Sequence, residues 1–264
     1  MKNTMLILSV LIGCLSFTFL QVKDKGFRPP GTVEVVEGFF FDDIERTNLD
    51  WREYLSWIAE KGDGKDSKAY KNALPDTTVW MNEFDDGEPF KQTYFRHAAY
   101  DYYPVVGISY EQVLAYCNWR TDRVKEMCQA NGIDFPNFKY RLPTNLEWEL
   151  IATTGRNNHE KKIKKLVKKY DWPHTVFNMQ YKDNHPDVAA AAKAKITAPV
   201  RSFLPNSYEI YNLIGNVSEM VAEEGIAKGG SFLDPFEEGI ISKKYAYDAP
   251  QKWLGFRCVA EILE

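Results

Sequence analysis

Only four cysteines occur in this chain of 264 residues, at positions 14, 117, 128 and 258. That number is too small for a disulfide-dense mini-scaffold, and it excludes an all-cysteine zinc site in the folded body. The length and the 44% hydrophobic residues are enough for the core of one large domain or of two smaller ones. A formal net charge of −4 gives no general attraction to nucleic acid or to anionic lipid.

Residues 1–22 have the pattern of a targeting segment, because Lys2 precedes an apolar run from Met5 to Leu20. Within this run, Leu11-Ile12-Gly13-Cys14 resembles a bacterial lipobox, which predicts acylation of Cys14 and a membrane anchor. An uncleaved anchor or an ordinary signal peptide is the alternative, since the residues after Cys14 stay apolar. Each interpretation places the protein outside the cytosol, in the cell envelope, where disulfides can form.

After the leader we expect a tether over residues 23–32 and one folded domain over residues 33–264. Val33, Val35 and the run of phenylalanines at 39–41 indicate strands. A helix is predicted from about Asn48, and residues 60–76 have the composition of a loop. From Pro199 onward, short apolar runs alternate with Gly, Asn and Pro, which predicts turns and short strands.

Two capping boxes mark further helix starts. Ser109 and Gln112 form the first, at the head of a helix expected to end near Gly132, and Thr144 and Glu147 form the second. A lysine-rich segment at 159–170 predicts a solvated amphipathic helix, with a patch for nucleic acid or lipid headgroups as the alternative.

Six segments stand out in their order along the chain: Glu45–Asn48 (ERTN), Tyr103–Cys117, Arg141–Glu149 (RLPTNLEWE), Asn212–Glu219 (NLIGNVSE), Lys228–Phe232 (KGGSF) and Gly255–Cys258 (GFRC). Taken together, they resemble the formylglycine-generating-enzyme (sulfatase-modifying factor) domain family. The resemblance covers the chain from about Phe39 to its C-terminus and implies a single α+β domain with much irregular structure, related to the C-type lectin fold.

Most residues of these segments have structural interpretations of their own. The Gly229-Gly230 pair predicts a tight turn or close packing, and Trp119 and Trp148 are expected as core anchors. Arg141 and Arg257 are expected to be buried and paired with carboxylates such as Glu147 or Glu149.

The segment from Asn212 to Glu219 carries a set of oxygen ligands that suits Ca²⁺. The resemblance implies binding through the side chains of Asn212 and Glu219 and the main-chain carbonyls of Gly215 and Val217. The alternative is a turn in which the two side chains only satisfy backbone N–H groups. A second calcium site of the family is expected to be lost, because no Asp-Gly-Phe segment follows Asn178.

The cysteine pair that the family uses to oxidise a substrate cysteine is missing. These two thiolates bind copper and stand three and eight positions after the serine of the Gly-Gly-Ser motif. Counting from Ser231 gives Asp234 and Gly239, so neither copper nor the oxidase activity is expected. Related iron enzymes that form C–S bonds are not matched either, because the four histidines include no His-x-x-x-His spacing.

The resemblance also implies a structural disulfide between Cys117 and Cys258, which leaves Cys128 as a buried free thiol. In the entropic account, a loop of roughly 140 residues closed in this way is worth about 4–5 kcal/mol.

Two functional hypotheses follow. The first is a non-catalytic binding or scaffold protein of the bacterial envelope, similar to lipoproteins of this fold in the gliding and type IX secretion apparatus. A groove around residues 234–247 would then hold protein, peptide or glycan. The second is an exported tailoring enzyme whose chemistry in the same groove needs no cysteine. The groove candidates are Ser231, Asp234, Phe236, Tyr245 and Tyr247.

Overall fold

The computed structural model describes residues 26–81, 87–155, 177–180, 196–235 and 241–263. Several sequence predictions fall outside these ranges: the leader with Cys14, the lysine-rich segment 159–170, Phe236 and Gly239. Among the described residues, no helix has both the length and the apolar character needed to cross a membrane.

Two four-stranded sheets form the centre of the domain. The first has the order β1-β2-β8-β3 and is antiparallel throughout. The second has the order β6-β5-β4-β7, with the pair β4 and β7 parallel. The strands are β1 (Thr32–Val36), β2 (Phe39–Asp42), β3 (Phe138–Arg141), β4 (Ser218–Met220), β5 (Ile226–Lys228), β6 (Tyr245–Ala246), β7 (Leu254–Gly255) and β8 (Val259–Ile262).

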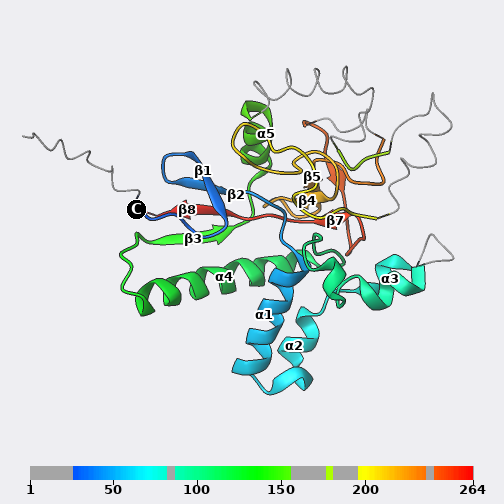
Figure 1. Ribbon diagram of the computed structural model, residues 1–264, viewed down its shortest axis with the longest axis horizontal. Coiled ribbons are helices and arrows are strands. Elements are labelled where there is room, and N and C mark those ends of the chain that lie inside the picture. The colour runs from blue at the N-terminus through cyan, green and yellow to red at the C-terminus, as the bar shows by residue number, and fades with distance from the viewer. Residues whose placement is uncertain (1–25, 82–86, 156–176, 181–195, 236–240, 264) are drawn as a thin grey trace, which may run out of the picture.

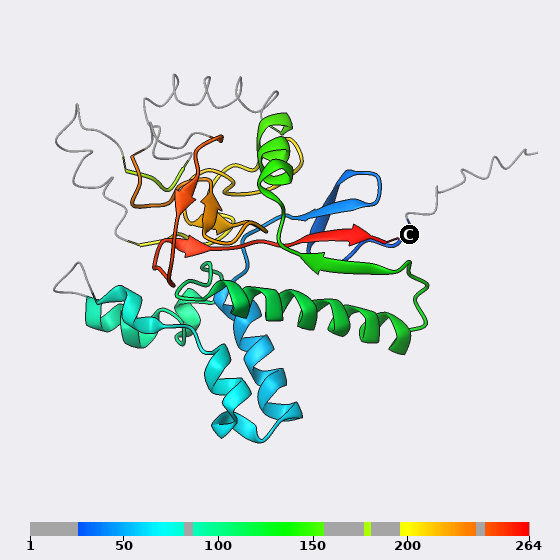
Figure 2. The same ribbon diagram turned by 180° about the vertical axis from the view of Figure 1, so that it is seen from behind.

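Helices cover both sides of the first sheet. The long helix α4 lies along one side, with α1 and α2 beyond it, and α5 lies on the other (Figures 1 and 2). The helices are α1 (Asn48–Lys61), α2 (Lys68–Ala73), α3 (Gly87–Thr93), α4 (Tyr110–Ala130) and α5 (Asn145–Thr154), with 3₁₀ turns η1 (Gly64–Asp66), η2 (Thr77–Trp80) and η3 (Ala98–Tyr100). This mixture of helices, short strands and long irregular connections confirms the α+β prediction.

The run of phenylalanines in β2 is explained by burial on both faces of the sheet. Successive side chains of a strand point to opposite faces. Phe40 therefore joins the cluster under α1 and α4, while Phe41 joins Trp148 of α5 in a second cluster. Trp148 is fully buried, as expected of a core anchor, whereas Trp119 is only partly buried at the edge of the first cluster.

The helix starts predicted from capping boxes are confirmed. Ser109 caps α4 together with Gln112, and Thr144 caps α5 together with Glu147. The prediction of a loop over residues 60–76 is wrong in part, because α2 forms there with Ser67 as its N-cap. Six residues are too few for a helical period to be recognised in the sequence.

Part of the expected tether belongs to the folded domain. Thr32 already lies in β1, and the ring of Phe27 packs on Phe138 with centroids 5.0 Å apart. The carbonyl oxygen of Pro30 accepts hydrogen bonds from Arg120 at 2.8 Å and from the Tyr140 hydroxyl at 3.0 Å. The domain therefore begins at about Phe27 rather than at residue 33.

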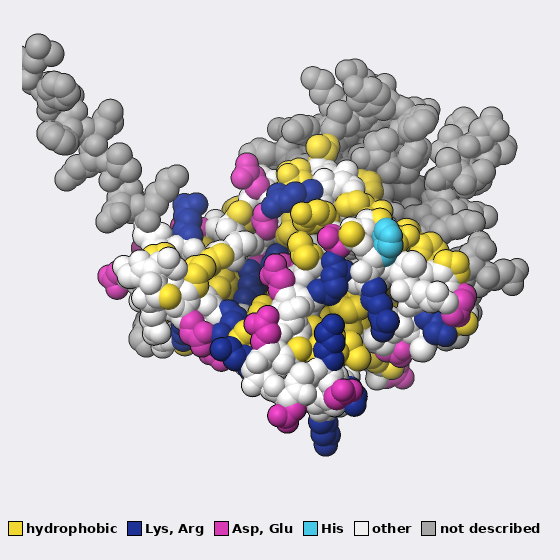
Figure 3. Space-filling view, turned by 60° about the horizontal axis from the view of Figure 1, so that its bottom comes forward, with side chains coloured by type: hydrophobic (Ala, Val, Ile, Leu, Met, Phe, Trp, Pro, Cys, Tyr) yellow, Lys and Arg dark blue, Asp and Glu magenta, His cyan; other side chains and the backbone are white. Residues whose placement is uncertain are grey.

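Charges of both signs alternate over the face that α1 and α2 present in Figure 3, with hydrophobic side chains exposed between them. This face shows no large region of one sign, which agrees with the small net charge of the chain.

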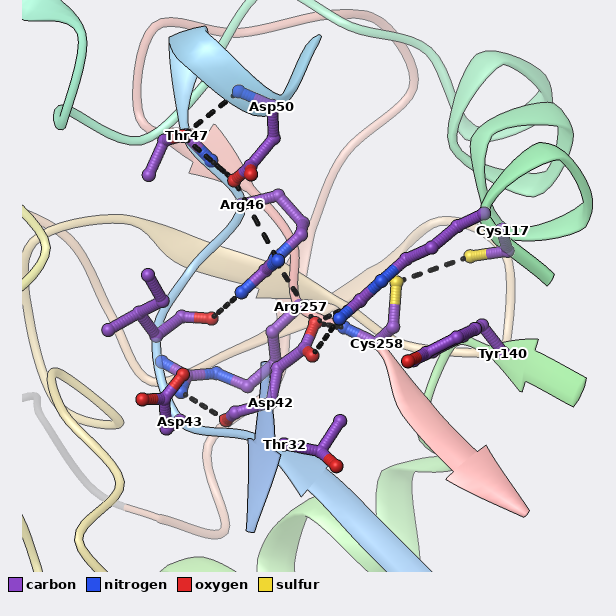
Figure 4. A network of polar contacts seen from close by, with 12 residues as sticks. Thr32, Asp42, Asp43, Arg46, Thr47, Asp50, Cys117, Tyr140, Arg257 and Cys258 are labelled. Carbon is purple, nitrogen blue, oxygen red and sulfur yellow. Dashed lines mark hydrogen bonds and ion pairs between the residues drawn. The ribbon is translucent and has the colours of Figure 1, made fainter. Parts of the chain in front are cut away.

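A buried carboxylate at the end of β2 joins four elements of the fold. Asp42 is 0% exposed and accepts two hydrogen bonds from Arg120 of α4, at 2.8 and 2.9 Å. It also accepts the main-chain N–H of Cys258 at 2.7 Å, and Arg46 lies 3.1 Å away, just before α1 (Figure 4). The main-chain oxygen of Asp42 accepts a further hydrogen bond from Arg257 at 3.1 Å. Two arginines thus balance one carboxylate away from water.

Replacing this carboxylate is expected to destabilise the whole domain. We expect Asp42→Asn to lower the free energy of unfolding by about 3–5 kcal/mol, because it leaves buried guanidinium groups without their counter-charge. Urea denaturation measures the loss. The neighbouring Asp43→Asn variant is the control: it loses an ion pair to Arg201, whose side chain is 55% exposed, and should cost about 0–1 kcal/mol. Equal losses in the two variants would contradict the central role of Asp42.

Candidate functional site

The Gly229-Gly230 pair makes a turn that other residues could not make. Both glycines have positive φ, +94° and +73°. A Cβ atom on Gly229 would lie 2.6 Å from the carbonyl oxygen of Leu213, and one on Gly230 would lie 2.9 Å from the Tyr245 hydroxyl. The expectation of a tight turn with close packing is confirmed.

Ser231 and Asp234 then close a second turn on themselves. The Asp234 carboxylate accepts hydrogen bonds from the Ser231 N–H at 2.8 Å and from the Ser231 hydroxyl at 2.6 Å. The Ser231 hydroxyl oxygen accepts in turn from the N–H of Leu233 at 3.3 Å. Ser231 is 1% exposed, so its hydroxyl is a structural group of the turn.

Among the described residues, no histidine lies beside this turn to serve as the base that a nucleophilic serine needs. A serine hydroxyl is activated by an adjacent general base, usually a histidine. Within the described ranges the only histidine is His97, which is exposed and caps η3 through its ring nitrogen. The local geometry therefore favours a folded loop over a catalytic serine.

The four groove candidates that the structure describes do not all lie in one site. The Tyr245 hydroxyl lies against Gly230, next to the Ser231–Asp234 turn, and the Tyr245 side chain is buried. Tyr247 instead lines a separate pocket with residues of α4 and of the turn between β4 and β5. Phe236 lies outside the described residues.

The segment that carries the expected calcium ligands is a left-handed loop before β4. Asn212, Gly215 and Asn216 have φ of 53°, 80° and 64°. Asn212 donates through Nδ2 to Glu45 and to the Val200 carbonyl, both at 3.1 Å, while its Oδ1 is buried and has no partner. An unpaired buried acceptor costs about 1–3 kcal/mol, so Asn212 Oδ1 fits the part of a cation ligand.

Glu219 fits that part less well, because Arg257 already balances its charge. Arg257 donates to the two carboxylate oxygens at 2.8 and 2.5 Å, and the Trp148 indole N–H donates at 2.8 Å. Both side chains of this pair are at most 1% exposed. The partner of Arg257 is therefore Glu219, not Glu147 or Glu149 as expected. The expected pair of Arg141 with Glu147 is confirmed, at 2.7 Å.

Two charged residues near this site were not singled out as site residues in the sequence. Burial raises the pKa of Glu45 to about 8, and its carboxyl accepts hydrogen bonds from the Asn212 and Asn216 amides. Lys228 is 0% exposed and donates to Glu149 at 2.7 Å, which lowers the pKa of Glu149. Glu45 stands in the ERTN segment and Lys228 in the KGGSF segment, so their membership of these motifs is the signal that could have identified them.

The three cysteines of the described chain are all buried. The sulfur atoms of Cys117 and Cys258 lie 3.5 Å apart as thiols (Figure 4), so the structure brings the expected pair together without the covalent bond. The hydrogen bond to Cys258, followed by burial, raises the pKa of the Cys117 thiol. Cys128 is the free buried thiol that was expected, and the bridge itself stays a prediction.

Comparisons with known proteins bear on the whole chain. Residues 4–262 match the family described as the sulfatase-modifying factor enzyme 1-like domain. Mouse formylglycine-generating enzyme is 23% identical over an alignment of 309 residues that covers 92% of this chain and 71% of the mouse protein. Mouse inactive C-alpha-formylglycine-generating enzyme 2 is 24% identical over 274 residues, an alignment that covers 88% of this chain and 78% of the mouse protein. The crystal structure of CarF is similar in fold, with a TM-score of 0.54 at 20% identity. The match covers 86% of this chain and 87% of CarF.

Oxidation is expected to join Cys117 and Cys258. Mass spectrometry of the protein purified without reductant should find these two cysteines in one bridged peptide. Reduction, or the Cys117→Ser variant, should then lower the free energy of unfolding by up to about 4–5 kcal/mol relative to the oxidised protein. Cys128→Ser is the control, because it removes a buried thiol that belongs to no pair. A fully reduced pair after export into an oxidising compartment would contradict the bridge.

Proposed function

The chain belongs to the sulfatase-modifying factor enzyme 1-like domain family, and within that family we propose that it is a non-catalytic binding or scaffold protein of a bacterial cell envelope. Its partners are envelope or outer-membrane proteins in a secretion-related or gliding-related complex, and peptide or glycan is the alternative ligand.

One observation carries the proposal. By the spacing that the family resemblance implies, the copper-binding cysteines of the oxidases would stand three and eight positions after Ser231, where this chain has Asp234 and Gly239. A carboxylate is a hard ligand that does not replace a thiolate on Cu(I). The Asp234 carboxylate is in addition engaged by the backbone and hydroxyl of Ser231, and the described cysteines are buried elsewhere.

Membership of a family with inactive relatives supports a binding role. The similar mouse protein named above is described as inactive, and it covers most of this chain. A fold of this family can therefore be kept without the oxidation reaction, because the buried ion pairs that hold the fold are separate from the missing cysteines.

The envelope location is proposed from the leader alone. Lys2, the apolar run and Cys14 supply the pattern of an exported, lipid-anchored protein. Two acyl chains on one cysteine hold a protein stably at a membrane.

The second candidate function is an exported tailoring enzyme, and the short hydrogen bond between Ser231 and Asp234 is the feature that favours it. The burial of Ser231 opposes it, since a substrate must reach the hydroxyl.

We further propose a structural Ca²⁺ ion at the loop before β4, held by Asn212 and the main-chain oxygens of Gly215 and Val217. The buried, unpartnered Oδ1 of Asn212 supports it. Glu219 would have to share its carboxylate between the ion and Arg257. The ion would stabilise the left-handed loop and take no part in a reaction.

The function is tested with the full-length chain and a Cys14→Ser variant expressed in the native type of host. The wild type should fractionate with membranes and elute in one complex of fixed stoichiometry, and the variant should lose the membrane fraction. Incubated with Cu(I), oxygen and a cysteine-containing sulfatase peptide, the purified protein should yield no formylglycine by mass spectrometry. A monomer with an activity that Asp234→Asn abolishes would establish the enzyme instead.

The calcium proposal is tested by thermal unfolding in Ca²⁺ and in EGTA. At about one hundred times its dissociation constant, Ca²⁺ should add about 2.7 kcal/mol, or roughly 5–10 °C in Tm. Asn212→Gly removes the oxygen ligand while it suits the positive φ, and it should abolish the difference. Mg²⁺ at the same concentration is the control for a general ionic effect. No change of the wild-type Tm between Ca²⁺ and EGTA would rule the site out.

A further inference from the structure

The C-terminal end of α4 and the residues that follow it expose hydrophobic side chains to solvent. Met127 is 42% exposed and Ile133 is 45% exposed. Phe135 and Phe27 are half-buried at the edge of the first core cluster. These four residues are called the α4-end patch below.

A glycine turn holds part of this patch in a fixed shape. Gly132, with φ of +62°, follows the end of α4. The N–H groups of Gly132 and Ile133 donate to the carbonyls of Gln129 and Cys128, at 3.2 and 2.9 Å. These two hydrogen bonds define a Schellman motif, which directs the residue after the glycine back toward the last turn of the helix. Ile133 is therefore held on the side of the turn that carries Met127, and the apolar surface is preformed.

The two phenylalanines extend the patch to the point where the chain enters the folded domain. The Phe27 ring lies 5.8 Å from the Phe135 ring and 5.0 Å from the Phe138 ring, between centroids. Phe138 belongs to β3, which pairs with the last strand, β8. Both ribbon views accordingly place the first described residues, the C-terminus and the end of α4 at one end of the domain (Figures 1 and 2).

The leader brings this end of the domain to a membrane before any other part. Gly26 stands 12 positions after Cys14, and a fully extended chain of that length spans at most about 40 Å. If the apolar run up to Leu20 is an uncleaved anchor instead, the connection is shorter still. The 21 residues of α4 alone span about 30 Å, so the two ends of the domain are not equally close to the anchor.

Charge does not favour a contact with anionic lipid here, so the attraction has to be apolar. The Lys125 ammonium lies 5.6 Å from the Phe138 ring centroid, while Asp134 is exposed between Ile133 and Phe135. Both signs are thus present around the patch, and the net charge of the chain is −4. Zwitterionic headgroups accommodate both signs, and apolar side chains gain free energy when they enter the boundary between headgroups and acyl chains.

We propose that the α4-end patch inserts into the surface of the bilayer that holds the leader, so that the folded domain lies on the membrane in one orientation. The second sheet, with the Ser231–Asp234 turn that follows β5, lies at the other end of the domain and then faces the aqueous compartment, where a partner protein can reach it (Figures 1 and 2). A weak contact is sufficient, because the anchor keeps the patch at a high local concentration of lipid. The inference rests on the anchored location proposed above, while the choice of this surface rests on the structure.

A fluorescent probe at two positions of one helix tests the contact. Met127→Cys and Leu114→Cys are introduced separately into the full chain, labelled with NBD and reconstituted into phosphatidylcholine vesicles with or without doxyl-labelled lipid. Leu114 is the matched control, because it lies on α4 with 39% exposure, about 20 Å from Met127 along the helix axis. Doxyl lipid should quench the probe at position 127 about twofold or more and leave the probe at position 114 unchanged. The wild-type chain gives the background from the native cysteines.

Two further substitutions test whether the attraction is apolar. Ile133→Asp, combined with the probe at position 127, should remove at least half of the quenching, because a carboxylate is unfavourable in the apolar part of a bilayer. Glu60→Asp, at an exposed carboxylate of α1, should change nothing. High salt should also leave the quenching unchanged, since screening weakens only electrostatic contacts. Thermal unfolding in detergent verifies that both variants are folded, and the comparison of the two probes needs neither of them.

Equal quenching at positions 127 and 114, or quenching at neither in a chain that stays bound to vesicles, would overturn the contact and leave the scaffold function in place. Blue-shifted emission at position 127 without quenching would show that protein, such as a second copy, covers the patch, and would overturn lipid as its occupant. A chain that does not bind vesicles would overturn the anchored location together with the contact. Quenching at position 127 alone, in a chain that forms no envelope complex, would support the contact and reject the scaffold function.

Discussion

The buried carboxylate of Asp42 is the interaction on which the rest of the fold depends. Removing a carboxylate from water is unfavourable unless opposite charges and hydrogen-bond donors surround it. Here those partners come from Arg120 of α4, from Arg46 just ahead of α1 and from the segment that leads into β8, while β2 carries the carboxylate itself. Strands of four residues could not hold these elements in place through their ladder hydrogen bonds alone. The ion cluster requires all of them to be present at once, and so couples the helices to the sheet.

The Gly255–Cys258 segment connects this cluster with a second one. Arg257 reaches Glu219 through its guanidinium and also donates to the Asp42 carbonyl, while Cys258 donates its N–H to the Asp42 carboxylate and faces Cys117. A short motif thus satisfies two buried carboxylates, which is a structural task. Such a segment keeps its structural role whatever reaction the chain does or does not perform.

Local rules predicted local structure well. The capping boxes of Ser109 and Thr144 were recognised because each joins residues three apart, a distance that does not depend on the fold. Glycines 229 and 230 were recognised because glycine, unlike other residues, adopts positive φ without a steric penalty. Pairings over long distances were not: the partner of Arg257 is Glu219, and Phe27 packs on Phe138, far along the chain. Tyr245 and Tyr247 stand two positions apart and lie in different surroundings, which no spacing rule predicts.

By itself, the sequence determined the fold class, the family and the absence of the oxidase cysteines, because each depends on which residues occur and in what order. It also indicated which cysteines belong together through the order of the motifs. Only the tertiary structure decided which charges meet. It placed Asp234 in a closed turn with Ser231, left Asn212 with an unused oxygen, and assembled an acidic pocket around Tyr247 from three distant segments. The physical reason is that burial and charge pairing depend on distances in space, and those are set only when the core has packed.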